Sequence, residues 1–530
     1  MKMIQILDCT LRDGGYINNW FFGEKNIKNI MINLEKANVD IIECGYIKDK
    51  AKLDKNSTIY PGFVNIRSQK KSDTLYVGMI NYGEFDISKI PSCDSNTLDG
   101  IRVVFKKEEW QNAVIYAEAV KKKGYKVFIQ PMATINYTDM ELLGLIQEVN
   151  RITPEALYIV DSFGVMNRND LLRLYYLLEN NLFPNIKIGY HAHNNLQLAF
   201  SNAQSLVEES KKRDIIIDSS IQGMGRGAGN LNTELFVKFL NETYDTDYNI
   251  YPLLKIIDET TSIEYSKNYW GYSLPHYLSA LYNCHPNYAT YLNDKNTLTI
   301  KNMEEILSSI SLERSQKFDK LYIENLYNDF QKSVIDDECI LINFREIFKS
   351  KEILVLASGK TIETNEEEIK KYITKDTVVI SVNFIPKNIK IDWLFISNAK
   401  RAEKILLKEN IPCIVTSNLQ ITSDNKYIVD YNSLLNLVDH VSDNAMLMLL
   451  EFLKNVGIRH ILLAGFDGYG HTQDYVDSED NLPMSELKKS RINSGVIKVL
   501  DKYLDCMDID WITESIYNKH SSKLAYTEGR

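Results

Sequence analysis

Residues 3–15 read MIQILDCTLRDGG, an apolar strand pattern followed directly by a polar, glycine-containing turn. The strand pattern recurs along the first ~240 residues, and longer amphipathic segments separate its copies. Strands that alternate with helical segments are typical of βαβ units and therefore of a parallel sheet. The predicted strands cover residues 3–8, 40–45, 75–80, 100–105, 126–131, 156–161, 186–191 and 215–223.

Eight strands within about 250 residues is the number and size of a closed (β/α)8 barrel, the TIM barrel. An open, doubly wound sheet is the alternative. Near-even spacing and polar residues at the C-terminal ends of the strands favour the barrel. The predicted helices cover residues 24–37, 108–123, 138–150, 168–179, 194–210 and 230–242.

The chain continues with a helical, aromatic-rich region at 250–335, and a second α/β pattern begins near residue 350. We expect three parts: a TIM barrel at 1–245, a helical extension and linker at 246–345, and a Rossmann-like α/β domain at 346–530. The second pattern predicts strands within 351–359, 377–384, 391–397, 411–417 and 460–468, and a helix opened by Ser442 and Asp443 that ends near Gly457.

The composition excludes several classes of protein. The 530 residues include 61 Lys and Arg against 71 Asp and Glu, a net charge of -10, so neither nucleic acid nor an anionic membrane is an expected partner. The N-terminus does not have the pattern of a signal peptide, and no uninterrupted apolar run reaches the roughly 18 residues of a membrane span. The seven cysteines are scattered without a C-x-x-C pair. We therefore expect a cytoplasmic protein without a disulfide framework.

The turn after the first strand contains Arg12, Asp13, Gly14 and Gly15. In a parallel barrel this turn lies on the catalytic face. The glycines permit close approach of a ligand, and the planar guanidinium of Arg12 suits an oxyanion. The alternative is a structural turn in which Arg12 and Asp13 only pair with each other.

His191 and His193 come at the end of the seventh predicted strand. Residues i and i+2 of a strand point to the same side, so both imidazoles can reach one cation. With an aspartate expected across the barrel mouth, the pair predicts a divalent metal site rather than two structural histidines. Two nitrogens with carboxylate and water oxygens suit Mn²⁺, Mg²⁺ or Fe²⁺ better than a structural zinc.

The glycine-rich segment GMGRGAGN at 223–230 follows the eighth strand. It imitates a dinucleotide-binding fingerprint, but that fingerprint belongs to the first βα turn of a Rossmann unit. A turn without a ligand is a second interpretation. We favour a third, in which the turn lets the backbone pass beneath the metal site and offers Asn230 to it.

Four ordered motifs in residues 1–290 resemble the metal-dependent TIM-barrel lyases and aldolases of the HMG-CoA lyase-like superfamily, and among them the 4-hydroxy-2-oxovalerate aldolases. The motifs are LDCTLRDGGY (7–16), IIECGY (41–46), YHAHNN (190–195) and QGMGRGAGN (222–230). The resemblance implies Asp13, His191 and His193 as metal ligands, with Asn230 at or beside the fourth position. It also implies that Arg12 stabilises an enolate oxygen and that Glu43 holds this arginine in place.

One position departs from the aldolase pattern. These aldolases have a catalytic histidine where this chain has Tyr16, and a tyrosine after the barrel also assists, for which Tyr272 is the candidate here. A tyrosine hydroxyl keeps its proton at neutral pH and is a poor base without help. Tyr16 is therefore predicted to orient substrate or to donate a proton, and the general base is not identified by the sequence.

The resemblance implies a carbon–carbon lyase that uses Mn²⁺ or Mg²⁺ to form or cleave a bond between pyruvate, as its enolate, and an aldehyde. One alternative is an acyl-CoA-dependent Claisen-condensing synthase of the same superfamily. Another is a barrel that serves only as a scaffold for a C-terminal sugar-transfer or nucleotide-sugar-binding domain. The intact set of Arg12, Asp13, His191 and His193 argues against an inactive barrel.

The C-terminal domain is similar to Rossmann-like domains of bacterial sialyltransferase-like proteins. Open α/β sheets bind ligands at the C-terminal ends of their strands, where this chain has Asn383, Asn398 and Asp467. The resemblance implies a sugar nucleotide as ligand and a role in surface-sugar biosynthesis. A domain used only for assembly is the alternative, and we expect a homodimer.

Overall fold

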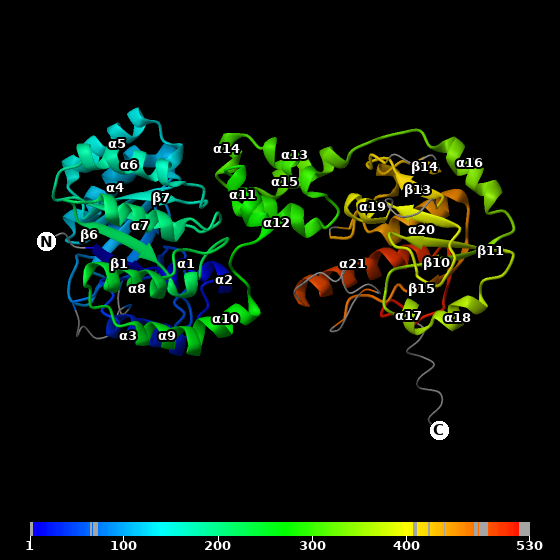
Figure 1. Ribbon diagram of the computed structural model, residues 1–530, viewed down its shortest axis with the longest axis horizontal. Helices are drawn as coiled ribbons and strands as arrows, with labels where there is room; N and C mark the ends of the chain where they lie inside the picture. The colour runs from blue at the N-terminus through cyan, green and yellow to red at the C-terminus, as the bar shows by residue number, and fades with distance from the viewer. Residues whose placement is uncertain are drawn as a thin grey trace, which may run out of the picture. The chain divides into compact units, whose positions relative to one another are not determined.

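The computed structural model describes residues 4–63, 66, 73–405, 411–421, 425–438, 440–470, 475 and 486–518. The chain divides into two compact units (Figure 1). The first comprises Met1–Tyr291 and Leu307–Asp319, and the second comprises Leu292–Ile306 and Lys320–Arg530.

The first unit is a closed parallel barrel, which confirms the predicted TIM-barrel fold. The sheet order is β1-β9-β8-β7-β6-β5-β4-β2, and parallel pairing of Leu7 with Ile41 and of Asp8 with Ile42 joins β1 to β2. A short strand, β3 (Ile59–Tyr60), pairs in parallel with the end of β2 and has no counterpart in the prediction. The barrel strands are β1 (Ile4–Asp8), β2 (Ile41–Ile47), β4 (Leu75–Asn81), β5 (Gly100–Phe105), β6 (Lys126–Pro131), β7 (Ala156–Asp161), β8 (Lys187–Ala192) and β9 (Ile215–Ser219).

Helices on the outside of the barrel form where amphipathic segments are introduced by capping residues. The Asn167 side chain accepts hydrogen bonds from the backbone N–H groups of Asn169 and Asp170, and Thr138 with Glu141 forms a capping box. The outer helices are α3 (Glu24–Lys36), α4 (Trp110–Lys122), α5 (Asp139–Ile152), α6 (Arg168–Asn181), α7 (Ala199–Glu209) and α8 (Thr233–Tyr244). The predicted helices at 194–210 and 230–242 therefore begin later than expected, because loops at the barrel mouth occupy their first residues.

The barrel interior combines an apolar base with a buried layer of charged residues. Leu7, Val77, Phe128 and Ile216 pack together inside the barrel. The buried charges lie on β2, β5 and β9 as Glu43, Arg102 and Asp218. A completely buried ion is tolerated only when it is paired, so this layer marks the part of the barrel that supports a site.

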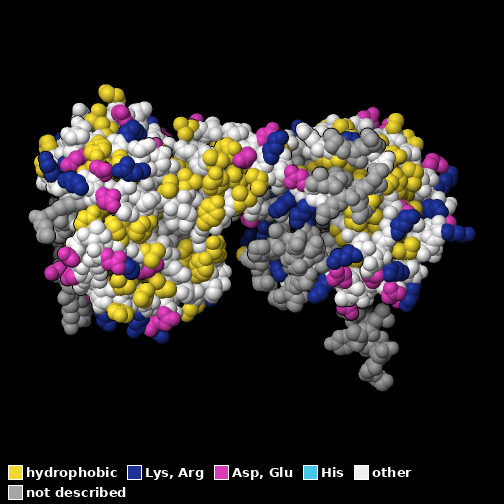
Figure 2. Space-filling view, in the orientation of Figure 1, with side chains coloured by type: hydrophobic (Ala, Val, Ile, Leu, Met, Phe, Trp, Pro, Cys, Tyr) yellow, Lys and Arg dark blue, Asp and Glu magenta, His cyan; other side chains and the backbone are white. Residues whose placement is uncertain are grey.

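Helices α9 (Ile250–Ile256), α10 (Ser262–Lys267) and α11 (Leu274–Leu281) continue the first unit after the barrel. Five further helices precede the second sheet: α12 (Pro286–Lys295), α13 (Ile300–Ser308), α14 (Leu312–Ser315), α15 (Lys320–Gln331) and α16 (Glu338–Ile347). Within the described ranges, no helix combines the length and apolarity needed to span a bilayer. Acidic and basic side chains are interspersed on the face of the barrel seen in Figure 2.

The second unit contains a seven-stranded parallel sheet in the order β14-β13-β12-β11-β10-β15-β16. The order reverses direction between β10 and β15, as in doubly wound folds. Its strands are β10 (Glu352–Leu356), β11 (Thr377–Val382), β12 (Trp393–Ile396), β13 (Cys413–Thr416), β14 (Lys426–Val429), β15 (His460–Ala464) and β16 (Asp508–Trp511). Its helices are α17 (Thr361–Thr364), α18 (Glu366–Lys371), α19 (Ala399–Ile405), α20 (Ala445–Val456) and α21 (Glu486–Leu504).

Two features of this unit differ from the sequence prediction. Strands β14 and β16 were not predicted, because each has only four residues and includes charged or half-exposed positions. Helix α20 does not begin at Ser442 and Asp443. Asn444 is its N-cap, since the Asn444 side chain accepts hydrogen bonds from the backbone N–H groups of Met446 and Leu447.

Candidate metal and oxyanion site

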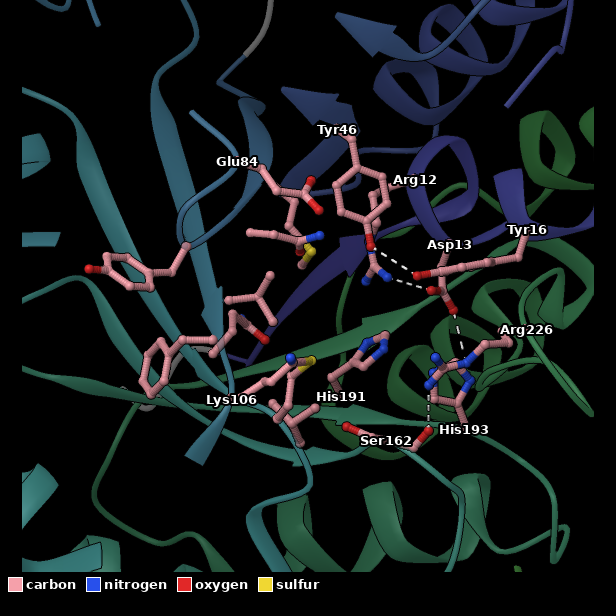
Figure 3. A pocket seen from close by; sticks show the side chains of 18 of the residues that line it. Arg12, Asp13, Tyr16, Tyr46, Glu84, Lys106, Ser162, His191, His193 and Arg226 are labelled. Carbon is pink, nitrogen blue, oxygen red and sulfur yellow. Dashed lines mark hydrogen bonds and ion pairs between the residues drawn. The ribbon is translucent and has the colours of Figure 1, made fainter. Parts of the chain in front are cut away.

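A cavity of about 250 Å³ opens at the C-terminal ends of the barrel strands. Figure 3 shows Arg12, Asp13 and His191 around it, with Tyr16 and Arg226 on one side and Lys106 on another. The polar residues that line the cavity are Arg12, Asp13, Tyr16, Tyr46, Asn81, Tyr82, Glu84, Lys106, Glu109, Gln130, Ser162, His191, His193 and Arg226. The cavity occupies the position at which TIM barrels place their catalytic groups.

Asp13, His191 and His193 meet at the base of this cavity. One potential ligand atom from each lies within 4.8 Å of the other two, and all three residues are buried. Asp13 ends α1 (Thr10–Asp13), the short helical turn that follows β1. His191 lies near the C-terminal end of β8, and His193 directly follows that strand. The i, i+2 spacing of the histidines thus presents both imidazoles to the same side, with their ring centres 5.3 Å apart.

The glycine-rich turn passes directly beside these residues. A Cβ atom on Gly225 would lie 2.9 Å from an oxygen of Asp13 and 2.3 Å from the amide nitrogen of Asn230, so only glycine fits there. The Asn230 Nδ2 atom donates a hydrogen bond to Asp13 Oδ2 at 2.6 Å. Asn230 therefore lies beside the Asp13 carboxylate, and its own Oδ1 has no hydrogen-bond partner among the described residues.

A chain of buried ion pairs supports the cavity. Arg12 pairs with Asp13 through Nη1 and donates from Nε to Glu43 Oε2 at 2.8 Å. Arg102 pairs with the same Glu43 oxygen at 2.8 Å and also with Asp218. Positive and negative groups thus alternate from Asp13 to Asp218, which fixes the Arg12 guanidinium in one orientation.

The network also sets the orientation of His191. Its Nδ1 lies 3.0 Å from Asp218 Oδ2, close but not aligned as a hydrogen bond. Because Nδ1 faces this carboxylate, Nε2 is the nitrogen left for a cation.

The protonation states of the other two residues suit a metal site. Burial lowers the pKa of His193 to about 3, so its imidazole is neutral near pH 7 and keeps a lone pair for a cation. Burial alone would raise the pKa of the Asp13 carboxyl, but Arg12 and then His193 hold it below its ordinary range. A neutral nitrogen beside an ionised carboxylate is the form in which these groups bind a metal.

Several buried polar atoms around the triad have unused hydrogen-bonding capacity, and three of them bear on ligand binding. His193 Nδ1, Asn230 Oδ1 and Arg12 Nη2 have no hydrogen-bond partner in the described part of the chain. Buried polar atoms are normally satisfied, so orphaned ones point to a ligand. His193 Nδ1 and Asn230 Oδ1 are acceptors that can face a cation, and Arg12 Nη2 is a donor that can face an oxyanion. This set fits a divalent metal that carries an anionic substrate.

Tyr16 belongs to the same cavity, whereas Tyr272 lies apart. The Tyr16 hydroxyl is 3.2 Å from that of Tyr46, and the Tyr16 ring stacks edge-on against Trp20. Tyr272 is 54% exposed and is not among the described residues that line the cavity.

Sequence reasoning missed several charged residues of the site, among them Arg102, Asp218 and Arg226. A signal existed for the first two, because each is a charged residue within a mostly apolar strand, GIRVVF and IIIDS. Arg226 lies within the glycine-rich segment, in which the prediction assigned a role only to the glycines and to Asn230.

Comparison with known proteins shows which family model and which proteins the barrel region is similar to. A family model described as HMGL-like matches residues 102–259. A 4-hydroxy-2-oxovalerate aldolase from Bacillus cereus is 23% identical over 267 residues, which cover 49% of this chain and 76% of that protein. An oxaloacetate decarboxylase from Mycobacterium tuberculosis is 24% identical over 241 residues, 44% of this chain and 69% of that protein. Among solved structures, an HMG-CoA lyase from Brucella melitensis aligns with a TM-score of 0.41 and 14% identity, over 50% of this chain and 99% of that one.

Proposed function

We propose that this chain is a divalent-metal-dependent aldolase. Its barrel is similar to the HMGL-like family model and to a 4-hydroxy-2-oxovalerate aldolase, which supports the proposal. In this proposal the barrel forms or cleaves the carbon–carbon bond between pyruvate, as its enolate, and an aldehyde. Asp13, His191 and His193 hold the cation, Mn²⁺ or Mg²⁺, with Asn230 beside them. The bound cation supplies Lewis acidity to the oxygen atoms of the 2-oxo acid.

The observation that carries this proposal is the unused Nη2 donor of Arg12. Arg12 is 4% exposed, and two nitrogens of its guanidinium already pair with Glu43 and Asp13. The third, Nη2, is buried beside the triad without a partner among the described residues. A preorganised donor of this kind stabilises the negative oxygen of an enolate at no cost in reorganisation.

The two hydroxyls of Tyr16 and Tyr46 supply a route for a proton. In the condensation direction a base removes a proton from the pyruvate methyl group. The resulting enolate carbon then adds to the aldehyde carbon, a carbon–carbon bond forms, and the carbonyl π bond breaks. The new alkoxide oxygen takes up a proton, and we assign the Tyr16 hydroxyl as the donor of that proton. Burial, and then Tyr16, raises the pKa of Tyr46, so Tyr46 stays protonated and can donate to Tyr16 in turn.

A test that needs no aldehyde is exchange of the pyruvate methyl protons in deuterated water. We expect the full chain with added Mn²⁺ to exchange these protons, as followed by proton NMR. The exchange is predicted to stop when the cation is chelated and to return when Mn²⁺ is restored. Absence of exchange in the metal-loaded protein would overturn the proposal, because enolate formation is common to both directions of the reaction.

A sugar nucleotide as ligand of the second unit, a role in surface-sugar biosynthesis and a homodimer stay predictions. The first is tested by a thermal shift of the full chain with sugar nucleotides. For it we expect a variant of Asn383 or Asp467 to lose the shift.

A further inference from the structure

Arg226 has a guanidinium group at the cavity, and no carboxylate of the described residues lies within ion-pair distance of it. It lies between β9 and α8 and lines the cavity. Its Nη2 donates to the carbonyl oxygen of Ser162 at 2.8 Å, and its Cζ is 5.4 Å from the centre of the Tyr16 ring. Its Nε is buried and has no hydrogen-bond partner, and no described residue forms an ion pair with it.

The neighbouring histidine, His285, does not accept a hydrogen bond from Arg226 either. The Nδ1 atom of His285 accepts a hydrogen bond from the backbone N–H of Asn287 at 3.2 Å. A neutral His285 therefore carries its proton on Nε2, the atom 3.5 Å from Arg226 Nη1. Burial, and then Arg226, lowers the pKa of His285 to about 3, which keeps it neutral. Two nitrogens of Arg226, Nε and Nη1, are thus left without an acceptor in the part of the chain that the structure describes.

The charges around the triad do not balance the positive charge of Arg226. The buried network joins two guanidiniums, Arg12 and Arg102, with three carboxylates, Asp13, Glu43 and Asp218, and so carries one net negative charge. A divalent cation makes this net charge positive by one, and the single carboxylate of pyruvate neutralises it. Before the methyl proton is removed, the charge of Arg226 has no counterpart in the donor substrate, and the proposed function assigns the later enolate oxygen to Arg12.

Other charged groups at the cavity do not supply the missing negative charge. Glu84 already pairs with Lys48 at 3.0 Å. Glu109 and Lys106 both line the cavity, and their opposite charges offset each other. Arg226 itself lies over Tyr16, the residue to which the proposed function assigns protonation of the acceptor oxygen.

We propose that Arg226 binds an anionic group, a carboxylate or a phosphate, on the aldehyde that joins pyruvate. The inference rests on the proposed function and deepens it by naming the chemical class of the acceptor. Arginine suits both anions because its planar fork donates two parallel hydrogen bonds. Arg226 is thereby a specificity-determining residue for the second substrate.

The test compares matched pairs of acceptors that differ only in charge. Succinic semialdehyde is paired with butanal, and glyceraldehyde 3-phosphate with glyceraldehyde, each condensed with pyruvate in the presence of Mn²⁺. The full chain is expected to prefer the anionic member of at least one pair in kcat/KM. The two pairs distinguish a carboxylate from a phosphate.

Arg226→Gln is expected to reduce the preference for the anionic acceptor about tenfold or more, through a higher KM for the anionic member. Arg226→Lys is expected to fall between.

Binding provides a readout apart from turnover. Calorimetric titration with inorganic phosphate and with succinate is expected to show binding of at least one anion to the full chain. For Arg226→Gln we expect that binding to be about tenfold weaker or more. Arg168→Gln removes an exposed arginine of the same barrel and is expected to bind as the unchanged protein does.

Three results would overturn the inference: no preference for the anionic members, an equal loss for both members in Arg226→Gln, or transfer of the effect to Lys106→Gln. The equal loss would assign Arg226 a structural role, and the transfer would assign the anion to the lysine. Pyruvate proton exchange separates these failures from failure of the proposed function. A protein that exchanges without preferring anions refutes only the role of Arg226.

Discussion

In both parallel sheets of this chain, polar residues lie at the C-terminal ends of the strands, but the two sheets differ in how far these residues are hydrogen-bonded. At the barrel mouth, His193 Nδ1, Asn230 Oδ1 and Arg12 Nη2 are buried without hydrogen-bond partners in the described residues. At the C-terminal ends of the strands of the second sheet, the Asp467 carboxylate accepts hydrogen bonds from the backbone and side chain of Thr361.

The remaining strand-end residues of the second sheet are also mostly engaged. Asn383 Oδ1 accepts from the Ser397 backbone at 3.3 Å, and Asn398 Nδ2 donates to the Asn296 carbonyl oxygen at 3.0 Å. The buried hydroxyl of Ser397 is an exception. Gly359 and Gly465 also approach closely, since a Cβ on Gly359 would lie 2.3 Å from the Gly465 oxygen. A polar strand end therefore indicates a site most strongly when its hydrogen bonds are left incomplete.

The largest expected effect is the loss of activity when a triad ligand is removed. His193→Ala is predicted to reduce metal-dependent proton exchange to background, because two ligands cannot hold the cation in place. The fold is expected to survive, since the barrel core consists of apolar strand residues. Circular dichroism checks the fold, and His460→Ala, an exposed histidine of the second unit, is the matched control. A collapsed spectrum in His193→Ala would make this histidine structural.

The buried ion network predicts the next effect, on stability. Glu43→Gln leaves Arg12 and Arg102 without their shared carboxylate and is expected to cost about 3–5 kcal/mol of unfolding free energy. Glu242→Gln removes an exposed partner of Lys238 and is expected to cost about 0–1 kcal/mol. Urea denaturation of both variants gives the comparison. Equal costs would mean that the buried network does not stabilise the barrel.

Arg12→Lys tests the geometry of the oxyanion donor while keeping its charge. A flexible ammonium cannot reproduce the contacts to Asp13 and Glu43 together with a free donor, so turnover is expected to fall about 10²–10³-fold. Arg168→Lys, on the exposed surface, is the control. Steady-state kinetics within a few-fold of the unchanged protein would reduce Arg12 to a partner in a structural turn.

The smallest effect is expected at the second sheet. Asp467→Asn weakens the hydrogen bonds to Thr361 and is predicted to cost about 1 kcal/mol of unfolding free energy, with no change in pyruvate proton exchange. Parallel denaturation and exchange measurements check both statements. A loss of exchange would show that the second sheet takes part in the chemistry of the barrel.

The sequence was most informative where one local rule decides the structure. Alternating apolar runs predicted all eight barrel strands, and the i, i+2 spacing predicted that His191 and His193 face the same side. The pairing of Arg102 with Glu43 and Asp218 was not predicted, because it joins residues far apart in the chain and depends on barrel closure. The unused donors of Arg226 could not be predicted for the same reason, since they depend on the tautomer of His285 and on burial.

Binding of Mn²⁺, followed by electron paramagnetic resonance, tests the central difference between the two sheets most directly. The full chain is predicted to bind one Mn²⁺ tightly, and His193→Ala is predicted to lose this site while Asp467→Asn keeps it. Tight binding that survives in His193→Ala, or that is lost in Asp467→Asn, would contradict the assignment of the metal to Asp13, His191 and His193.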